Sequence, residues 1–198
     1  MPSQDMRAIS RHFLFNSLNA VAALCRKDPE AAAELVGEIS AYLQLSLEEK
    51  PSLIPLEEEL AHLFSYLRIQ QVRFPGRLKI IPDIEAGLTC RLPAFTLQPL
   101  ADNAAVHGVL PQRAGGTVHI SARKMASGTV RIVIQDDGVG MTPAQLSRLF
   151  KKGPQQHSLY RINQALKKAG LPVLSINSGP GQGTTVILEI PAGDTPAS

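Results

Sequence analysis

The sequence has few cysteines, no long apolar segment and no compact set of metal ligands. Its 198 residues include only two cysteines. These two, Cys25 and Cys90, lie far apart and form no CxxC pair, which excludes a disulfide framework and the usual zinc sites. The longest apolar runs are interrupted by charge or proline before 18 residues, so no segment is predicted to span a bilayer. No signal peptide precedes the first amphipathic segment, so we expect a cytoplasmic protein.

The composition is that of an ordinary globular chain. Hydrophobic residues make up 44% of the sequence and charged residues 19%, which excludes disordered and collagen-like structure. The net charge is +3 and the isoelectric point about 9.0, and the basic residues are scattered. This favours a solvated surface of mixed sign, and we expect no direct binding to nucleic acid.

Residues 1–50 are predicted to form a helical hairpin. Apolar residues recur at helical spacing over residues 9–26, and Asp28, Pro29 and Glu30 then provide an N-cap, a first-position proline and a first-turn acid. A second helix is expected to continue to about Glu49. Because a lone hairpin cannot bury both of its apolar stripes, we expect a homodimer with a four-helix bundle.

Residues 51–198 are predicted to form a second, α+β domain, with the boundary in the proline-containing segment 50–55. A helix is expected from Leu56 onwards, and the apolar period then changes several times. The further expected elements are strands at 78–81, 117–124, 129–136, 173–177 and 184–190, and helices at 95–107 and 158–169. This order favours an α/β sandwich, with one sheet and helices on one face.

His12 and Asn16 are four residues apart, so both lie on one face of the first helix. A neutral imidazole nitrogen is a competent nucleophile toward phosphorus, and the amide could position a water or a phosphoryl oxygen. The alternative is a partly buried histidine with a structural role only.

The stretch PLADNAAVHG places Asp102, Asn103 and His107 on adjoining positions of a predicted helix. The amide oxygen of Asn103 is a suitable hard ligand for Mg²⁺ when phosphates and water complete the octahedron. The alternative is a helix that carries a polar stripe toward solvent.

Two glycine-containing stretches follow strands. In the first, residues 136–141, Asp136 could accept a hydrogen bond from the exocyclic amine of adenine, which would favour ATP over GTP. Gly138 and Gly140 would let the backbone approach the base. An ordinary strand-ending turn is the alternative. The second stretch, residues 178–185, lies between two strands and opens no helix, which argues against a dinucleotide fingerprint. No P-loop sequence is present.

Taken together and in order, these stretches resemble the sensor histidine kinases of the LytS/YehU/AlgZ type, whose ATP-binding half belongs to the GHKL superfamily. The resemblance extends from about Ala8 to Pro191, and HFLFNSLN is its most specific motif. It implies that His12 is the phosphoacceptor, that Asn103 binds Mg²⁺ and that Asp136 binds adenine. The remaining nucleotide-binding residues that it implies are His107, Gly138, Gly140, Gly181, Gly183 and Thr184.

The resemblance also implies an activity and partners. The chain would autophosphorylate from ATP and pass the phosphoryl group to an aspartate of a response regulator, which in this family often carries a LytTR-type DNA-binding domain. Asn16 would orient water in the reverse, phosphatase reaction, and Asp102 replaces the glutamate of the Mg²⁺-binding box. We therefore count His12, Asn16 and Asp102 as catalytic. A membrane would be contacted only by a sensor region that precedes the helix carrying His12.

Three departures from the family pattern keep a second hypothesis open. Arg11 replaces the usual proline before the histidine, Asp102 is one methylene shorter than glutamate, and Gln156 and Ser158 replace both glycines of the second glycine box. Glycines at a helix N-terminus let backbone N–H groups approach phosphate oxygens. The alternative is a degenerate kinase that acts as a signalling scaffold, or as a phosphatase, without autophosphorylation.

Overall fold

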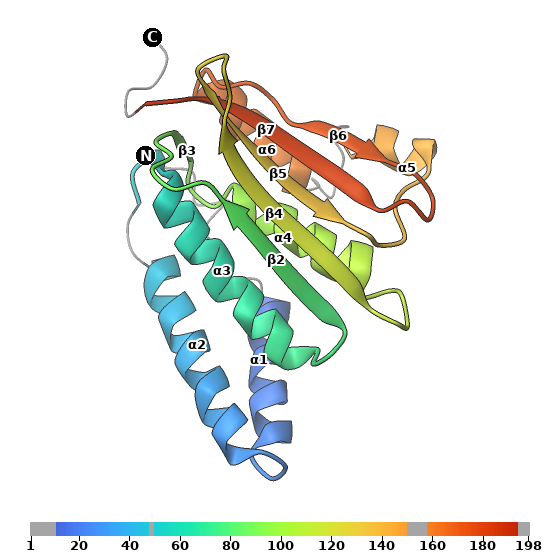
Figure 1. Cartoon of the computed structure of the whole chain (residues 1–198). Coiled ribbons are helices and arrows are strands. Elements are labelled where there is room, and N and C mark those ends of the chain that lie inside the picture. Colours follow the sequence, from blue (N-terminus) through green and yellow to red (C-terminus); the bar gives the residue numbers. More distant parts are fainter. Residues whose placement is uncertain (1–10, 48–49, 150–157, 194–198) are drawn as a thin grey trace.

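The computed structural model describes residues 11–47, 50–149 and 158–193. The chain begins with a hairpin of two helices, α1 (Arg11–Leu24) and α2 (Pro29–Leu47), which extends below the rest of the molecule in Figure 1. Asp28 caps α2, since its carboxylate accepts a hydrogen bond of 3.0 Å from the backbone N–H of Ala31. The predicted hairpin is confirmed.

A five-stranded sheet forms one layer of the remaining structure. The strand order is β2-β4-β5-β7-β6; β2 and β4 are parallel, and the other neighbours are antiparallel. The strands are β2 (Leu78–Ile84), β4 (Gly116–Lys124), β5 (Thr129–Asp136), β6 (Ser175–Ser178) and β7 (Thr184–Pro191). In β4, Val118, Ile120 and Ala122 are fully buried, whereas His119 between them is exposed. This alternation buries one face of the sheet.

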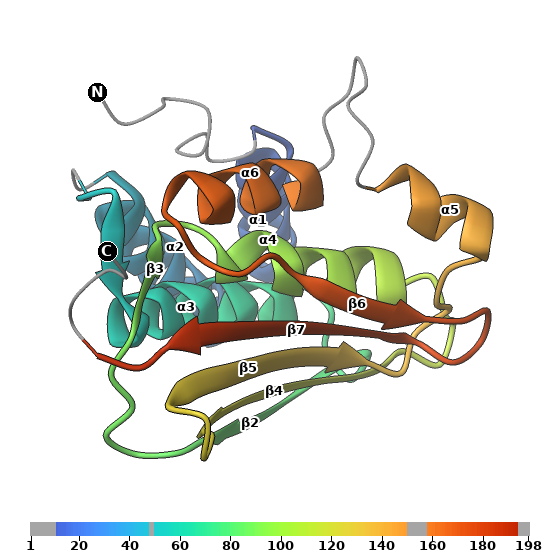
Figure 2. The same cartoon turned by 90° about the horizontal axis from the view of Figure 1, so that it is seen from above.

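Helices cover that buried face, as Figure 2 shows from above. They are α3 (Leu56–Arg73), α4 (Leu97–Asp102), the π-helix η2 (Asn103–Val109) and α6 (Ser158–Lys168). In the same view no helix of the described residues lies against the other face of the sheet. The α+β sandwich predicted from the sequence is therefore confirmed. No helix among the described residues is long and apolar enough to cross a membrane.

The hairpin shares its core with the sandwich. The ring of Phe13 on α1 packs between Tyr42 on α2 and Tyr66 on α3, with 5.1 Å between ring centroids in both pairs. All three side chains belong to the continuous hydrophobic core that also contains the sheet residues. Helix α3 thus connects the hairpin to the sheet, because it packs against both.

The structure adds short elements that the sequence did not predict. Strand β1 (Leu53–Pro55) lies in the proline-containing segment taken as a boundary, and it pairs with β3 (Arg91–Pro93). Helix α5 (Pro143–Arg148) follows β5. Each is too short for a periodic pattern. The helix expected over 95–107 begins at Leu97, because Phe95 has φ 62° and cannot be helical. From Asn103 it continues as a π-helix.

Candidate functional site

A cavity of about 300 Å³ opens between the helical layer and the ends of β5 and β7. Its wall combines the polar residues singled out from the sequence with apolar side chains. The residues that line it are Leu100, Asn103, Ala104, His107, Gly108, Ile134, Asp136, Gly140, Met141, Leu149, Ser158, Leu159, Ile176, Thr184 and Val186. A mainly apolar cavity with a few convergent polar groups suits a flat, partly polar ligand.

Asp136 is the buried carboxylate of this cavity. It ends β5, pairs in register with Thr184 of β7, and is only 3% exposed. Its Oδ1 accepts a hydrogen bond of 2.9 Å from the backbone N–H of Gly138. Burial raises its pKa from 3.8 to about 6, while the hydrogen bonds act in the opposite direction. A buried carboxylate of this kind gains from a ligand that donates a hydrogen bond to it.

The glycine-containing loops meet at the end of the cavity and are joined through backbone groups. The N–H of Val139 donates to the carbonyl of Gly108 at 3.0 Å, and the N–H of Gly181 donates to the carbonyl of Val139 at 2.8 Å. Gly140 and Gly183 have φ +63° and +71°. A Cβ on Gly183 would lie 1.9 Å from the carbonyl oxygen of Asp136, so only glycine fits there.

The π-helix supplies the opposite wall. Its wider turn is closed by a hydrogen bond of 2.9 Å from the N–H of Leu110 to the carbonyl of Ala105. Gly108 allows Asp136 to approach, because a Cβ at position 108 would lie 2.5 Å from Asp136 Oδ1. Asn103 donates from Nδ2 to Ser158 Oγ at 3.1 Å. A cation would bind the amide oxygen, so this hydrogen bond is compatible with a Mg²⁺ site at Asn103.

Asp102 does not line the cavity. Its carboxylate accepts a hydrogen bond from the Tyr66 hydroxyl on α3, on the side of the hairpin. Burial and the neighbouring Asp102 carboxylate raise the pKa of Tyr66 well above its usual value of 10.0, so the tyrosine is a neutral donor. The consecutive residues Asp102 and Asn103 therefore contact different parts of the molecule.

The structure brings many of the predicted residues together. Asn103, His107, Asp136, Gly140 and Thr184 line one cavity, and the predicted glycines Gly138, Gly181 and Gly183 belong to the loops at its end. Asn16 is half-buried on α1. The side chain of His12 lies outside the described part of the chain, as does Gln156.

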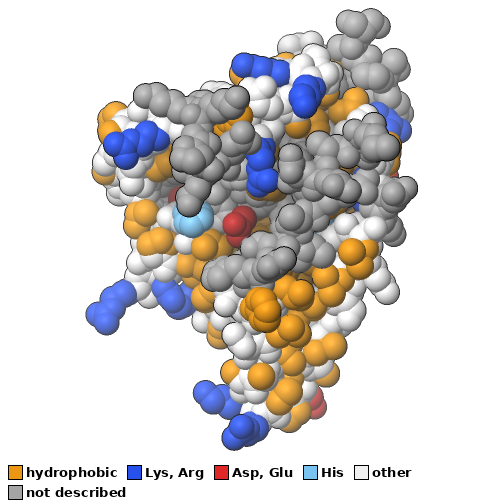
Figure 3. Space-filling view, turned by 180° about the vertical axis from the view of Figure 1, so that it is seen from behind, with side chains coloured by type: hydrophobic (Ala, Val, Ile, Leu, Met, Phe, Trp, Pro, Cys, Tyr) orange, Lys and Arg blue, Asp and Glu red, His pale blue; other side chains and the backbone are white. Residues whose placement is uncertain are grey.

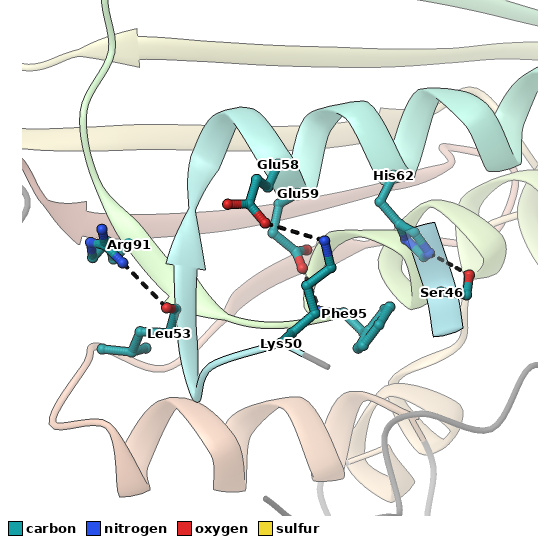
Figure 4. Close-up of polar contacts among 8 residues, drawn as sticks. All are labelled: Ser46, Lys50, Leu53, Glu58, Glu59, His62, Arg91 and Phe95. Carbon is teal, nitrogen blue, oxygen red and sulfur yellow. Dashed lines mark hydrogen bonds and ion pairs between the residues drawn. The ribbon is translucent and has the colours of Figure 1, made fainter. Parts of the chain in front are cut away.

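A second polar cluster, not predicted from the sequence, fixes the start of α4. Figure 4 shows Glu59 on α3 with its carboxylate directed at the chain near Phe95. Its carboxylate is 1% exposed and accepts hydrogen bonds from the backbone N–H groups of Phe95 and of Leu97, the latter at 2.9 Å. Burial nevertheless raises the pKa of Glu59 to about 7. Glu59 thereby stabilises the left-handed backbone at Phe95 and the beginning of the helix that leads to Asn103.

His62, one turn along α3, is also buried. Its Nε2 lies 2.9 Å from Ser46 Oγ, and its ring packs edge-on against Phe95. Burial lowers the pKa of His62 from 6.5 to about 4, so the imidazole is neutral at physiological pH. No pattern in the sequence predicted a role in the site for Glu59, His62, Tyr66 or Gly108. Only Gly108 had a local signal, as a glycine inside a helical pattern.

Two protein-family models match the chain. The histidine kinase model matches residues 6–78, and the model of histidine kinase-, DNA gyrase B- and HSP90-like ATPases matches residues 93–194. The second match covers more than half of the chain and contains the entire cavity. Together they define a histidine-kinase helix region followed by an ATPase domain.

Individual proteins agree with this class. The chain is 35% identical to YwpD of Bacillus subtilis over 193 residues, covering 96% of this chain and 69% of YwpD. It is 36% identical to the sensor protein LytS of Bacillus anthracis over 92% of this chain but only 32% of that protein. The chain belongs to the LytS-type sensor histidine kinases, and it spans about a third of the length of LytS.

A solved structure shows the same fold. The histidine kinase domain of the blue-light activated histidine kinase EL346 from Erythrobacter litoralis superposes with a TM-score of 0.54. The match covers 91% of this chain and 94% of that domain at 17% sequence identity. At this identity the likeness supports the fold alone.

Proposed function

We propose that the chain is an active kinase core that binds Mg²⁺-ATP in the cavity and phosphorylates itself on His12. The observation that carries the proposal is the buried Asp136 carboxylate facing a cavity that also contains Asn103 and Thr184. Adenine offers an exocyclic amine to such a carboxylate, whereas guanine presents an oxygen at that place. We therefore propose ATP rather than GTP as the nucleotide.

In this proposal Mg²⁺ binds together with the phosphates of the nucleotide. Asn103 would hold Mg²⁺ through its amide oxygen, and the metal, when bound, neutralises charge on the phosphate oxygens. His107, at the mouth of the cavity, and the backbone of the loops carrying Gly181 and Gly183 would contact the nucleotide. The glycines keep those loops close to the cavity, because side chains at positions 140 and 183 would collide with neighbouring carbonyl oxygens.

The phosphoryl transfer itself needs little covalent help from the protein. The unprotonated imidazole nitrogen of His12 attacks the γ-phosphorus, so an N–P bond forms while the bond to the bridging oxygen breaks, and ADP leaves. The second step transfers the phosphoryl group from His12 to an aspartate of a response regulator. We place Asn16, one helical turn from His12, as the residue that orients water in the reverse hydrolysis of the phosphorylated regulator.

The hairpin is proposed to dimerise. It carries exposed large hydrophobic side chains at Phe15, Leu18, Val36 and Leu47. Figure 3 shows hydrophobic side chains gathered over the lower part of the molecule, where α1 and α2 lie. Burying such side chains against a second hairpin gives the four-helix bundle expected from the sequence. The regulator, of LytTR type in this proposal, would bind next to His12.

A second candidate function is a signalling scaffold or phosphatase that does not autophosphorylate. The observation that favours it is Ser158, which replaces a glycine of the family pattern, lines the cavity and is hydrogen-bonded to Asn103. A side chain at this place occupies room that a phosphate would otherwise have. The two candidates differ in whether His12 acquires phosphate from ATP.

The test combines binding with labelling. Calorimetry with Mg²⁺-ATP, and with Mg²⁺-GTP as the control, should show binding selective for ATP. Incubation with γ-labelled ATP should then give acid-labile phosphate that His12→Ala abolishes, with ATP affinity nearly unchanged. His119→Ala is the matched control, because His119 is an exposed histidine on the open face of β4. ATP binding without phosphohistidine would favour the second candidate.

A further inference from the structure

We propose that Tyr66 is a positioning residue that links helix α1, which carries His12, to the nucleotide cavity through Asp102. The inference rests on the proposed function, since it concerns the transfer of phosphate to His12. Tyr66 itself touches no nucleotide in this proposal. It acts through Asp102, the residue directly before Asn103.

The aromatic ring of Tyr66 is in contact with α1, so its packing depends on the position of that helix. The ring is only 2% exposed and packs against Phe13, with 5.1 Å between the centroids and 38° between the planes. Phe13 directly follows His12 in the helix. Because protein cores are closely packed, a displacement of α1 must change the contact between these two rings.

The hydroxyl of Tyr66 is fixed from two sides. It donates to the Asp102 carboxylate and accepts from Nε2 of Gln70. Oε1 of Gln70 accepts in turn from the Arg73 guanidinium at 2.7 Å, and that guanidinium lies 6.0 Å from the centre of the Phe13 ring. The hydrogen bond to a carboxylate is of the stronger, charge-assisted kind. These contacts form one connected cluster that begins and ends at Phe13.

Asp102 transmits this constraint to the cavity. It is the last residue of α4, and Asn103 is the first residue of the π-helix. Successive residues of a helix point about 100° apart around the axis. Asp102 therefore binds Tyr66 on the hairpin side, while Asn103 reaches Ser158 in the cavity. A hydrogen bond that holds Asp102 also sets the rotation of the turn that carries Asn103.

Tyr42 provides a matched comparison within the same cluster. Its ring is as buried as that of Tyr66 and lies at the same centroid distance of 5.1 Å from Phe13. Its hydroxyl, however, accepts a hydrogen bond of 2.9 Å from Gln98. Removing either hydroxyl leaves the aromatic packing in place, but only the Tyr66 hydroxyl binds Asp102.

The experiment compares Tyr66→Phe with Tyr42→Phe in the full 198-residue chain. The readouts are the ATP dissociation constant, the rate of phosphohistidine formation at saturating Mg²⁺-ATP, and Tm as a check of folding. Loss of one hydrogen bond to a charged group corresponds to a rate change of about tenfold. Tyr66→Phe should slow phosphorylation by about this factor and change the dissociation constant less than about twofold, whereas Tyr42→Phe should slow it less than about twofold.

A second variant alters the same hydrogen-bonded cluster without removing the bond to Asp102, so it separates loss of that bond from a general folding defect. Gln70→Met removes the other partner of the Tyr66 hydroxyl and keeps the bond to Asp102, so its rate should lie between those of the two tyrosine variants. Equal rates in Tyr66→Phe and Tyr42→Phe would overturn the inference alone. A loss of ATP affinity parallel to the loss of rate would also overturn it, because it would indicate a general distortion of the cavity. A wild-type chain that binds ATP without labelling would overturn the proposed function, and this inference with it.

Discussion

Replacing Glu59 by glutamine should change how the stability of the protein depends on pH. The wild-type carboxylate is buried and bonded to the backbone at Phe95 and Leu97, in the segment that leads into α4. Glutamine has nearly the same shape but carries no ionisable group. Any pH-dependent difference in unfolding free energy between the two chains therefore reports the ionisation of Glu59.

The magnitude follows from the pKa of Glu59, which rises from its ordinary value of 4.5 to about 7 on burial. One pKa unit corresponds to about 1.4 kcal/mol, so the linkage amounts to about 3 kcal/mol. Because the folded state favours the protonated acid, this contribution is fully present below pH 4.5. It is lost as the pH rises through about 7.

The assay is urea unfolding of both chains at intervals from pH 4.5 to pH 8. Glutamine has a single acceptor oxygen and should lose one backbone hydrogen bond, which makes E59Q less stable than wild type by about 1–3 kcal/mol at pH 4.5. Above pH 7 the wild type has lost about 3 kcal/mol of this relative stability, so E59Q should be as stable as wild type or up to about 2 kcal/mol more stable.

Glu58→Gln is the control, because Glu58 is the neighbouring glutamate but is exposed and forms an ion pair of 3.2 Å with Lys50. Exposed pairs contribute about 0–1 kcal/mol, so Glu58→Gln should show only a small, nearly constant difference from wild type. The reasoning about Glu59 is refuted if the difference between wild type and Glu59→Gln stays constant across the pH range.

Three further predictions concern other residues. Because burial lowers the pKa of His62 from 6.5 to about 4, wild type should lose stability relative to His62→Gln as the pH falls from 6.5 to 4. A difference in unfolding free energy that stays constant over this range, measured by urea unfolding, would contradict this. Asp136→Asn should weaken ATP binding by about tenfold in calorimetry, since an amide still accepts but carries no charge; unchanged affinity would show that adenine binds elsewhere. Gly183→Ala should lower Tm clearly more than Gly181→Ala, because both glycines have φ near +70° but only a Cβ at position 183 meets backbone, at 1.9 Å; equal losses would argue against this.

The sequence predicted most of the fold because its signals are local. The hairpin, the strands of the sheet and α6 follow from apolar periodicity and from turn residues, and only their ends moved by a few residues. The short pair β1 and β3 could not be predicted, because three residues carry no period and the partners are far apart in sequence. Phe95 gave no signal either, since nothing local announces a positive φ at a phenylalanine.

The cavity residues were predicted more completely than the residues that support them. Asn103 and Asp136 stand in recognisable motifs, and in the structure both line the same cavity. Glu59 stood among three consecutive glutamates that predict an acidic first turn of α3, and the sequence does not distinguish the buried one. Tyr66 lies 36 residues from Asp102, so their hydrogen bond follows only from the packing of α3 against α4.

The π-helix makes the number of residues between Asp102 and Leu110 critical. A π-turn contains one residue more than an α-turn. A chain with a single deletion within Asn103–Val109 could close the same segment as an ordinary α-helix, at little cost to the surrounding core. The flanking residues would then keep their places, whereas the side chains within the segment would take new angular positions around the axis, and a side chain would replace the glycine surface that now faces Asp136. The spacing in this segment is thus a requirement of the cavity rather than of the fold, and a one-residue deletion there separates the two.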